Sequence, residues 1–350
     1  MKVALIIAPN WRDYAKKYLP DCIKSLRKQN YKGQIKIFIA DNETSDESFL
    51  YLKKTVPEAE IVRNKNNDGF AKSNNDCIKK AMKEGFEYII LFNMDTVVDE
   101  DCVSMMVKAA KDNSKAGSVQ ARLMVHGEKD VINSLGNSTH FLGFGYCLDY
   151  RKNYIENYIE NYIDIMYPSG AAVLFKKEAL KKTGLFDEDF WMYNEDQELG
   201  WRLLLAGYKN ILADRAVVWH KYEFARSCKQ YYWMDRNRIL AILFCYRLPT
   251  LILIMPAFVL MEVGLMLFSI KSGWLKEKIR VWKYFLSFKN WKYIIKRRGE
   301  NQKLRKVKDK DIIDLISGKI WYQEVDDWKL RSINPFFDIY WKLVRFLIIW

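Results

Sequence analysis

Short apolar runs alternate with longer amphipathic stretches over the first 120 residues. Residues 3–8 are continuously apolar, as expected of a strand that is buried on both faces of a parallel sheet. Further strands are predicted at 35–40, 61–62 and 88–92, and helices at 14–29, 46–54 and 70–83. Strands that alternate with helices at this spacing predict βαβ units and a mostly parallel sheet, which is an α/β fold.

The middle of the chain carries a less regular pattern. It predicts a strand at 169–175, a helix at 177–183 that ends at Gly184, a helix through 201–206 and a last strand at 216–219. Residues 154–163 repeat the unit Tyr-Ile-Glu-Asn. The repeat is too short for a solenoid, so we interpret it as a local duplication in a loop or hairpin.

The character of the sequence changes after residue 238. We expect one domain over residues 1–238 and a hydrophobic, basic and aromatic membrane-associating region over residues 239–350. Residues 249–270 contain a single charged residue, Glu262, and are about long enough to cross the apolar core of a bilayer. Prolines at positions 249 and 256 would bend a helix here. A kinked span, a re-entrant hairpin and a helix in the membrane plane therefore all remain open.

Most of the net charge of +14 lies in one segment. Residues 271–310 contain 15 Lys and Arg against 3 Asp and Glu, so the rest of the chain carries a net charge of only about +2. Trp and Tyr are interleaved with these basic residues, a combination typical of the cytoplasmic membrane interface. We therefore expect an anionic membrane surface as a partner, and no nucleic acid. The expected location is the cytoplasmic face of the cell membrane, either peripheral or with one hydrophobic span or hairpin.

The cysteines and the start of the chain agree with a cytoplasmic setting. Six cysteines are scattered without a CxxC pair, which favours reduced thiols over a disulfide framework or a zinc site. The first predicted strand follows Met1 directly, and we expect no secretory signal.

Four polar segments could carry chemistry. They are residues 41–46 (Asp-Asn-Glu-Thr-Ser-Asp), 67–75 (Asn-Asp-Gly-Phe-Ala-Lys-Ser-Asn-Asn), 93–95 (Asn-Met-Asp) and 194–202 (Asn-Glu-Asp-Gln-Glu-Leu-Gly-Trp-Arg). Each segment taken alone could be a turn or a helix cap. However, Asp41 and Asp95 follow predicted strands, and ligands of parallel sheets bind outside the carboxyl ends of the strands.

The order and spacing of these segments resemble the family-2 glycosyltransferases of the GT-A fold, especially their rhamnosyltransferase-like branch. The matching motifs are residues 41–46, 67–75, 93–95, 169–171, 186–202 and the Trp-His pair at 219–220. The resemblance covers about residues 1–240, and residues 231–238 and the hydrophobic tail also look like that branch. Thr44, Met94 and Glu198 depart from its usual Ser, Pro and Asp, but none of these changes removes a group that the chemistry needs.

The resemblance implies a role for each matching position. Asp41 would contact the nucleotide, and Asp95 would bind a divalent cation, Mg²⁺ or Mn²⁺, with His220 as a further metal ligand or phosphate contact. Asp196 would be the general base, and Glu195 would orient the base or the acceptor. The remaining positions implied to bind the donor are Pro9, Asn42, Asn67, Gly69, Asn74, Asn93, Ser169, Gly170 and Ala171.

The implied function is inverting transfer of a sugar from a nucleotide-diphosphate sugar to a hydroxyl of a saccharide acceptor. A polyprenyl-diphosphate-linked acceptor in cell-surface polysaccharide or glycan synthesis would fit the expected membrane location.

The helical period predicts that the acids of residues 194–202 have different roles. Residues 195 and 198 share a helix face, whereas 196 points about 100° away from 195.

Four other functions are weighed against this one. A nucleotidyltransferase usually needs a basic, glycine-rich first loop, whereas residues 8–13 contain no glycine. A non-catalytic membrane-bound homologue is disfavoured because the acids implied for the metal and the base are intact. A nucleic-acid-binding protein could use residues 271–310, but the adjoining apolar run favours a membrane. A Rossmann dehydrogenase is disfavoured because no G-x-G-x-x-G follows the first strand.

Overall fold

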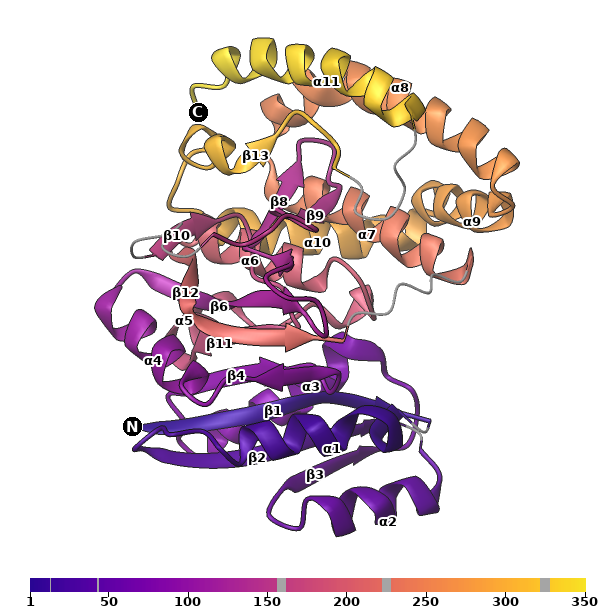
Figure 1. Ribbon diagram of the computed structural model, residues 1–350. Coiled ribbons are helices and arrows are strands. Elements are labelled where there is room, and N and C mark those ends of the chain that lie inside the picture. The colour runs from indigo at the N-terminus through magenta and orange to yellow at the C-terminus, as the bar shows by residue number, and fades with distance from the viewer. Residues whose placement is uncertain (13, 43, 156–161, 222–227, 322–327) are drawn as a thin grey trace.

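The computed structural model describes residues 1–12, 14–42, 44–155, 162–221, 228–321 and 328–350 (Figure 1). The strands are β1 (Lys2–Trp11), β2 (Gln34–Asn42), β3 (Glu60–Asn64), β4 (Tyr88–Phe92), β5 (Thr96–Val98), β6 (Ala116–Val125), β7 (Ile132–Ser134), β8 (Asn137–His140), β9 (Gly145–Cys147), β10 (Tyr162–Ile165), β11 (Ala172–Lys176), β12 (Lys209–His220) and β13 (Ile316–Ser317). The α-helices are α1 (Tyr14–Leu26), α2 (Asp46–Thr55), α3 (Gly69–Lys83), α4 (Cys102–Asp112), α5 (Lys177–Thr183), α6 (Glu195–Leu205), α7 (Cys228–Cys245), α8 (Leu248–Lys271), α9 (Leu275–Leu286), α10 (Phe288–Leu304) and α11 (Trp328–Leu347).

The main sheet is mixed, and its topology brings several strand ends to one edge. The strand order is β10-β12-β6-β11-β4-β1-β2-β3. Strands β1 to β4 pair in parallel, while β11 runs antiparallel between β4 and β6, and β12 is parallel to β6. The carboxyl ends of β1, β2, β4 and β12 therefore lie at the same edge as the amino end of β11. This arrangement confirms the α/β prediction and assembles the polar segments at that edge.

Helices cover both faces of this sheet. Neighbouring residues of a strand point to opposite faces, so a continuously apolar strand presents apolar side chains to the helices on each side. In β1, Val3, Leu5 and Ile7 pack with α1, α2 and α4, whereas Ala4 and Ile6 pack with α3, α5 and α6. All five side chains are fully buried. The continuous apolar run that predicted β1 thus serves two separate hydrophobic layers.

A second core lies beyond the sheet, under the C-terminal helices α7 to α11 (Figure 1). Helix α6 belongs to both cores: Leu199 and Leu203 face the sheet, and Trp201 and Leu205 face the second core. The expected boundary at residue 238 falls inside α7, a continuous helix, and stays a prediction.

Four buried charged side chains join α7, α8 and α9 inside this second region. The guanidinium of Arg238 donates to Asp235 at 2.8 Å and also to Glu262. The ammonium of Lys278 donates to Asp235 and to Glu262, at 2.7 Å in each case. Burial would raise the pKa of Asp235, but Arg238 and Lys278 hold it below its usual range. The one charge in the apolar run, Glu262, is therefore neutralised inside the protein.

The apolar pattern predicted most elements and misplaced a few. Strands β1 to β4 and helices α1 to α3 and α5 are confirmed within a few residues. No prediction covered α4, β5 or β6, and the predicted strand at 169–175 begins only at Ala172. Strand β12 is longer than predicted because it continues through a register shift between Ala213 and Val217. In the predicted duplication, residues 156–161 lie outside the described residues, and Tyr162–Ile165 form β10.

Replacing Glu262 with leucine should lower the free energy of unfolding by about 3–5 kcal/mol, because two buried cations would keep only Asp235 as a counter-charge. Urea unfolding of the detergent-solubilised protein, followed by tryptophan fluorescence, measures the change. Lys276→Met, at an exposed position of α9, should have no effect. The double variant E262L/K278M should regain part of the loss, since it removes one cation together with the anion. No regain would mean that the four charges do not act as a unit.

Candidate active site

The end of β1 carries a buried asparagine that organises the neighbouring strand end. The side-chain amide of Asn10 donates to Asp41 and to Ser48, at 3.1 Å in each case, and its carbonyl accepts from the backbone N–H of Ala15. Pro9 precedes it at a register shift in the β1–β2 pairing, where a residue without an N–H is tolerated. Asn10 thus connects β1, β2 and α2, and no prediction named it.

Asp41 is fully buried and has partners within the protein. Its two carboxylate oxygens lie 2.8 and 2.7 Å from the hydroxyl of Thr44, and Arg63 lies 3.7 Å away. Burial raises the pKa of Asp41, although Thr44, Asn10 and Arg63 oppose the rise. Asp41 therefore stabilises the turn after β2, and its implied contact with a nucleotide stays a prediction.

The Asn-Asp-Gly segment forms the start of α3 and is held by its own polar side chains. Asn42 donates to the carbonyl of Gly69 at 3.2 Å, and the side-chain oxygen of Asn67 accepts from the backbone N–H of Gly69 at 3.2 Å. Asn74 donates to the carbonyl of Phe70, while its own side-chain oxygen is buried without a hydrogen-bond partner in the described residues. These contacts give the positions structural roles, and binding of a donor by them stays a prediction.

Asp95 and His220 meet at the end of β4 although 125 positions separate them in the chain. Nε2 of His220 lies 3.4 Å from Oδ1 of Asp95. The other oxygen of Asp95 accepts from the hydroxyl of Tyr14 at 2.8 Å. Burial would raise the pKa of Asp95, but the contacts with His220 and Tyr14 hold it below its usual range. The carboxylate is therefore charged at neutral pH.

The surroundings of this pair fit a divalent cation. Nδ1 of His220 lies 3.1 Å from the side-chain oxygen of Asn133. If Nδ1–H donates a hydrogen bond to this oxygen, the lone pair of Nε2 would be available to a cation held between His220 and Asp95. Oδ1 of Asn93 is buried without a hydrogen-bond partner in the described residues, and Oδ1 of Asp95 has the 3.4 Å contact with Nε2 of His220 as its polar neighbour. Oxygen and imidazole ligands suit Mg²⁺ or Mn²⁺. Among the described residues, no group of three or more Asp, Glu, His or Cys side chains is arranged so that it could hold a metal ion.

The turn before β11 joins this strand end to the acidic start of α6. The backbone N–H of Asn93 donates to the carbonyl of Ala171 at 2.9 Å, and that of Gly170 donates to Oδ2 of Asp196 at 3.2 Å. The backbone N–H of Ser169 is held by the side chain of Gln120. Ser169, Gly170 and Ala171 therefore bridge the segment of Asp95 and the segment of Asp196. Binding of a donor by these three residues stays a prediction.

Two neighbouring acids of α6 have raised pKa values. Burial raises the pKa of Asp196 to about 6, although backbone N–H groups of Gly170 and Gln197 oppose the rise. Burial and the nearby Asp196 raise the pKa of Glu195 well above its usual range. One oxygen of Glu195 is buried without a hydrogen-bond partner in the described residues. At neutral pH, Asp196 can therefore accept a proton, while burial and the neighbouring Asp196 disfavour the charged form of Glu195.

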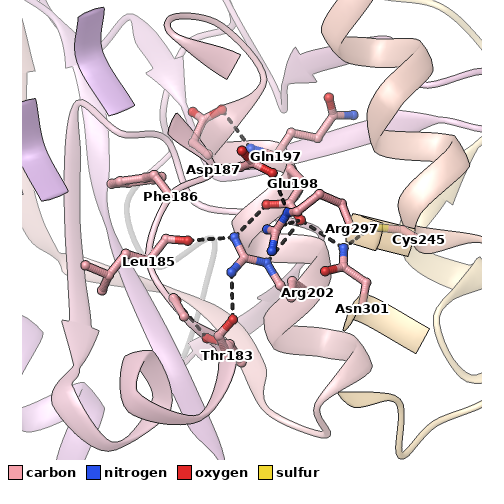
Figure 2. A network of polar contacts seen from close by, with 12 residues as sticks. Thr183, Leu185, Phe186, Asp187, Gln197, Glu198, Arg202, Cys245, Arg297 and Asn301 are labelled. Carbon is pink, nitrogen blue, oxygen red and sulfur yellow. Dashed lines mark hydrogen bonds and ion pairs between the residues drawn. The ribbon is translucent and has the colours of Figure 1, made fainter. Parts of the chain in front are cut away.

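The third acid, Glu198, is part of a buried structural network (Figure 2). Both of its oxygens accept from the guanidinium of Arg202, at 3.0 and 2.6 Å, and one also accepts from Asn301 of α10 at 2.9 Å. Arg202 in turn donates to the carbonyls of Thr183 and Leu185. Glu198 is fully buried, so the charge that replaces the family's usual Asp is fully compensated. Through these contacts with Arg202 and Asn301, the side chain of Glu198 connects α6 to α10.

A second contact from the C-terminal region holds the loop that leads into α6. In this loop Trp191, Tyr193 and Asn194 have φ angles of 59°, 68° and 62°. Such left-handed conformations are unfavourable for residues with a side chain by roughly 1–2 kcal/mol each. The side-chain nitrogen of Asn237 in α7 lies 2.9, 3.0 and 2.7 Å from the carbonyls of Phe190, Met192 and Tyr193. Asn237 therefore stabilises the strained approach to Glu195 and Asp196.

The same loop explains the glycine at the start of α3. The carbonyl of Trp191 accepts from the backbone N–H groups of Phe70 and Ala71 at 2.7 and 3.2 Å. Gly69 has a φ of +75°, and a Cβ atom there would lie 2.4 Å from that carbonyl oxygen. Only glycine allows the loop and the helix to come this close.

The structure brings together the residues that the sequence implied for metal and base, and it adds several that were missed. Asp95, His220, Asn93, residues 169–171, Asp196 and Glu195 are connected at one edge of the sheet through the contacts above. Tyr14, Asn10, Asn133 and Asn237 were not predicted. Asn237 lies within residues 231–238, a segment that looked like the family, so its position carried a signal. No signal in the sequence pointed to Asn133.

Comparison with protein families gives one match that covers half of the chain. The family described as "Glycosyl transferase family 2" matches residues 6–184. Poly-beta-1,6-N-acetyl-D-glucosamine synthase of Staphylococcus epidermidis is 28% identical over 200 residues, which are 57% of this chain and 45% of that protein. The synthase of Staphylococcus aureus strain COL is 25% identical over 202 residues, 57% of this chain and 46% of that protein. The chain thus spans less than half the length of these relatives.

Two solved structures resemble the fold. GalNAc-T7 with UDP, GalNAc and Mn²⁺ matches 70% of this chain and 48% of that chain, with a TM-score of 0.55 and 13% identity. Staphylococcus aureus TarS in complex with UDP matches 99% of this chain and 90% of that chain, with a TM-score of 0.50 and 15% identity. At these identities the likeness concerns the fold alone, and it agrees with the GT-A architecture.

Asn237→Ala should lower the free energy of unfolding by about 1–3 kcal/mol, because it leaves buried carbonyls of the strained loop without their donor. Urea unfolding measures the change. Asn290→Ala is the matched control: Asn290 donates to a single carbonyl, that of Tyr284, at 2.9 Å in a half-buried position of α10. An Asn237→Ala variant no less stable than the control would show that the loop keeps its conformation without the amide.

Proposed function

The chain belongs to glycosyltransferase family 2, and from this membership we propose that it transfers a sugar from a nucleotide-diphosphate sugar to a saccharide hydroxyl with inversion at the anomeric carbon. One observation carries the proposal. A charged carboxylate paired with a histidine and a carboxylate whose pKa is about 6 are connected through the turn before β11, at the carboxyl edge of the sheet. Ligands of α/β sheets bind at this edge.

The proposed base is Asp196. An acceptor hydroxyl is a weak nucleophile until a carboxylate receives its proton. In a single displacement, the acceptor oxygen forms a bond to the anomeric carbon, the bond from that carbon to the diphosphate oxygen breaks, and the hydroxyl proton passes to Asp196. The backbone N–H groups of Gly170 and Gln197 orient the carboxylate of Asp196. Glu195 lies beside it and, in its protonated form, can donate a hydrogen bond to the base or to the acceptor.

Asp95 and His220 are the residues that would hold a divalent cation, and Asn133 would fix the orientation of His220. When bound, such a cation neutralises negative charge on the leaving diphosphate. Asp95 is suited to this role because its carboxylate stays charged at neutral pH, and Tyr14 orients the oxygen that does not face His220.

We propose a uridine nucleotide as the donor and a hexose or N-acetylhexosamine as the sugar. Both structural neighbours were crystallised with UDP, and the two curated relatives are named for a polymer of N-acetylglucosamine. Transfer of rhamnose, which the sequence motifs suggested, stays a prediction. Thermal stabilisation by UDP-N-acetylglucosamine, UDP-glucose and dTDP-rhamnose, each with Mn²⁺, distinguishes these donors. Stabilisation by dTDP-rhamnose alone would contradict the uridine proposal.

We propose a growing glycan as the acceptor, because the relatives are polysaccharide synthases by name. A polyprenyl-diphosphate-linked glycan at the cytoplasmic face of the membrane is the form that fits the apolar C-terminal region. Incorporation of radiolabelled sugar into a lipid extract of membranes tests this acceptor class. Label found only in water-soluble products would contradict it.

Asp95→Ala should abolish transfer and the metal-dependent part of UDP binding, while the protein stays folded. Calorimetric titration of UDP with and without Mn²⁺ measures the binding, and circular dichroism checks the fold. Asp164→Ala is the control, because Asp164 is an exposed acid on the edge strand β10. If Asp95→Ala binds UDP with an unchanged dependence on Mn²⁺, Asp95 is not the metal ligand.

The rate of transfer should depend on the protonation of Asp196. Because burial raises the pKa of this carboxyl to about 6, the base is lost as pH falls below 6 and is fully present well above it. We therefore expect kcat/KM to rise with pH through about 6. Asp196→Asn should lower turnover by about 10²–10⁴-fold and remove this pH dependence, with donor binding retained.

Glu195→Gln should have a milder effect, since a neutral amide resembles the protonated acid. The two variants are measured together under saturating donor. Near-normal turnover in Asp196→Asn with an inactive Glu195→Gln would exchange the two roles.

A further inference from the structure

Two C-terminal helices lie side by side on the second core (Figure 1). The hydroxyl of Tyr340 in α11 donates to the carbonyl of Leu253 in α8 at 2.6 Å. The indole N–H of Trp350 donates to the hydroxyl of Thr250 at 2.9 Å. Helices α8 and α11 therefore form one layer at the end of the molecule that is farthest from β1 to β3 in the figure.

Both helices bury one face and expose an apolar opposite face. In α8, Leu251, Ile254, Ala257 and Met261 belong to the second core, as Phe337, Trp341 and Val344 of α11 do. The exposed large apolar side chains are Leu248, Ile252, Met255, Val259, Leu260, Val263, Leu267, Phe268 and Ile270 on α8, and Ile333, Phe336, Ile339, Leu343, Phe346 and Leu347 on α11, with Ile349 beyond it. Since both helices bury their inner faces in the same core, their outer faces point away from it together. We call these exposed side chains the apolar layer.

The contacts of α8 argue against a helix that crosses a bilayer. Among the described residues, α8 is the one helix long and apolar enough to do so by length and composition. However, its inner face is held by the protein from Thr250 to Ser269, both of which are fully buried. Glu262 lies between them and is paired with Arg238 of α7 and Lys278 of α9. A helix that is held by the domain at Thr250, Glu262 and Ser269 presents its opposite face to lipid.

Unpaired basic residues follow the apolar layer in the chain. Lys271 ends α8, and α9 packs against α8. Lys271, Lys276, Lys283, Lys289 and Lys292 are exposed and have no ion pair within the described residues. Exposed apolar side chains stand among them: Ile279, Leu286, Phe288, Trp291 and Ile295. An apolar surface beside basic and aromatic residues matches the composition of helices that lie in a membrane interface.

We propose that the apolar layer of α8 and α11 docks onto an anionic bilayer with both helices in the plane of the membrane, and that the described chain does not cross it. Charge complementarity decides between lipid and a second copy of the chain. A symmetric contact between two copies through this layer would bring together the exposed Lys271 at the end of α8 and the exposed Lys276 and Lys283 of α9, which packs against α8, from both copies. An anionic headgroup surface offers the opposite charge. The proposal concerns membrane binding and is independent of the proposed reaction.

Flotation of the full chain with preformed vesicles tests the docking surface. The protein should float with phosphatidylcholine vesicles that contain phosphatidylglycerol, and less with phosphatidylcholine alone. The double variants L260D/V263D on α8 and L343D/F346D on α11 should each lose most of the flotation. Leu50→Asp is the matched control, because Leu50 is 62% exposed on α2, outside the layer. It should float like the unchanged protein.

The melting temperatures of all variants show whether a loss of flotation comes from unfolding, and light scattering gives the oligomeric state. Loss in the α8 variant with full flotation of the α11 variant would contradict a joint surface. A dimer that the variants convert to a monomer, with flotation unchanged, would assign the layer to a second copy and overturn the proposal.

Single fluorescent labels distinguish a helix in the plane from a span. Cysteines introduced at Leu248, Val259 and Ile270 carry an environment-sensitive dye, and the protein is added to the outside of vesicles. All three labels should be quenched to a similar extent by a shallow lipid-borne quencher and by dithionite added outside. Protection of one end from dithionite, with the deepest position at Val259, would indicate a crossing helix and overturn the proposal.

Discussion

The buried ion pair between Glu198 and Arg202 is the interaction on which the arrangement of the site depends. A buried carboxylate is tolerated only when its charge and lone pairs are compensated. Here the compensation comes from Arg202 on the same helix and from Asn301 on α10. Arg202 also donates to the carbonyl of Thr183, the last residue of α5, and to that of Leu185 in the loop after it. One charge therefore connects the sheet domain, the acidic helix and the C-terminal helices (Figure 2).

Because this ion pair holds α6 in place, the three nearby acids of the helix have different surroundings and therefore differ in charge and in pKa. Glu198 is neutralised by a cation and holds α6 in place. Glu195 is buried beside another acid and without a cation, so its protonated form is favoured. Asp196 receives backbone N–H groups from Gly170 and Gln197, which limit the rise in its pKa to about 6. The surroundings of each side chain, rather than its residue type, thus distinguish a structural acid, Glu198, from two acids with raised pKa values, of which Asp196 is the proposed base.

The C-terminal region supports the site and offers a surface at the same time. Asn237 of α7 holds the strained loop before α6, and Arg297 of α10 binds Asp187 at 2.6 Å where that loop region begins. The basic residues of the segment 271–310 fall into two groups, one for each of these roles. Lys278 and Arg297 are ion-paired inside the protein, whereas lysines such as Lys271 and Lys283 remain at the surface. Membrane binding through the outer face of α8 would thus involve the same group of C-terminal helices that holds the loop before Glu195 and Asp196.

The sequence by itself determined the features that depend on local periodicity and on order along the chain. The apolar runs predicted β1 to β4 and an apolar segment over residues 249–270 whose form they left open, and the positions of Asp95 and Asp196 within their motifs indicated both the family and its candidate site. Tertiary structure decided which partners each of these groups has. His220 meets Asn133, 87 positions away, and the α8 residue Glu262 meets Arg238 and Lys278. It also decided that the apolar helix exposes one face only. Such contacts leave no periodic trace in the sequence, because they depend on how distant segments pack and on how much water that packing excludes.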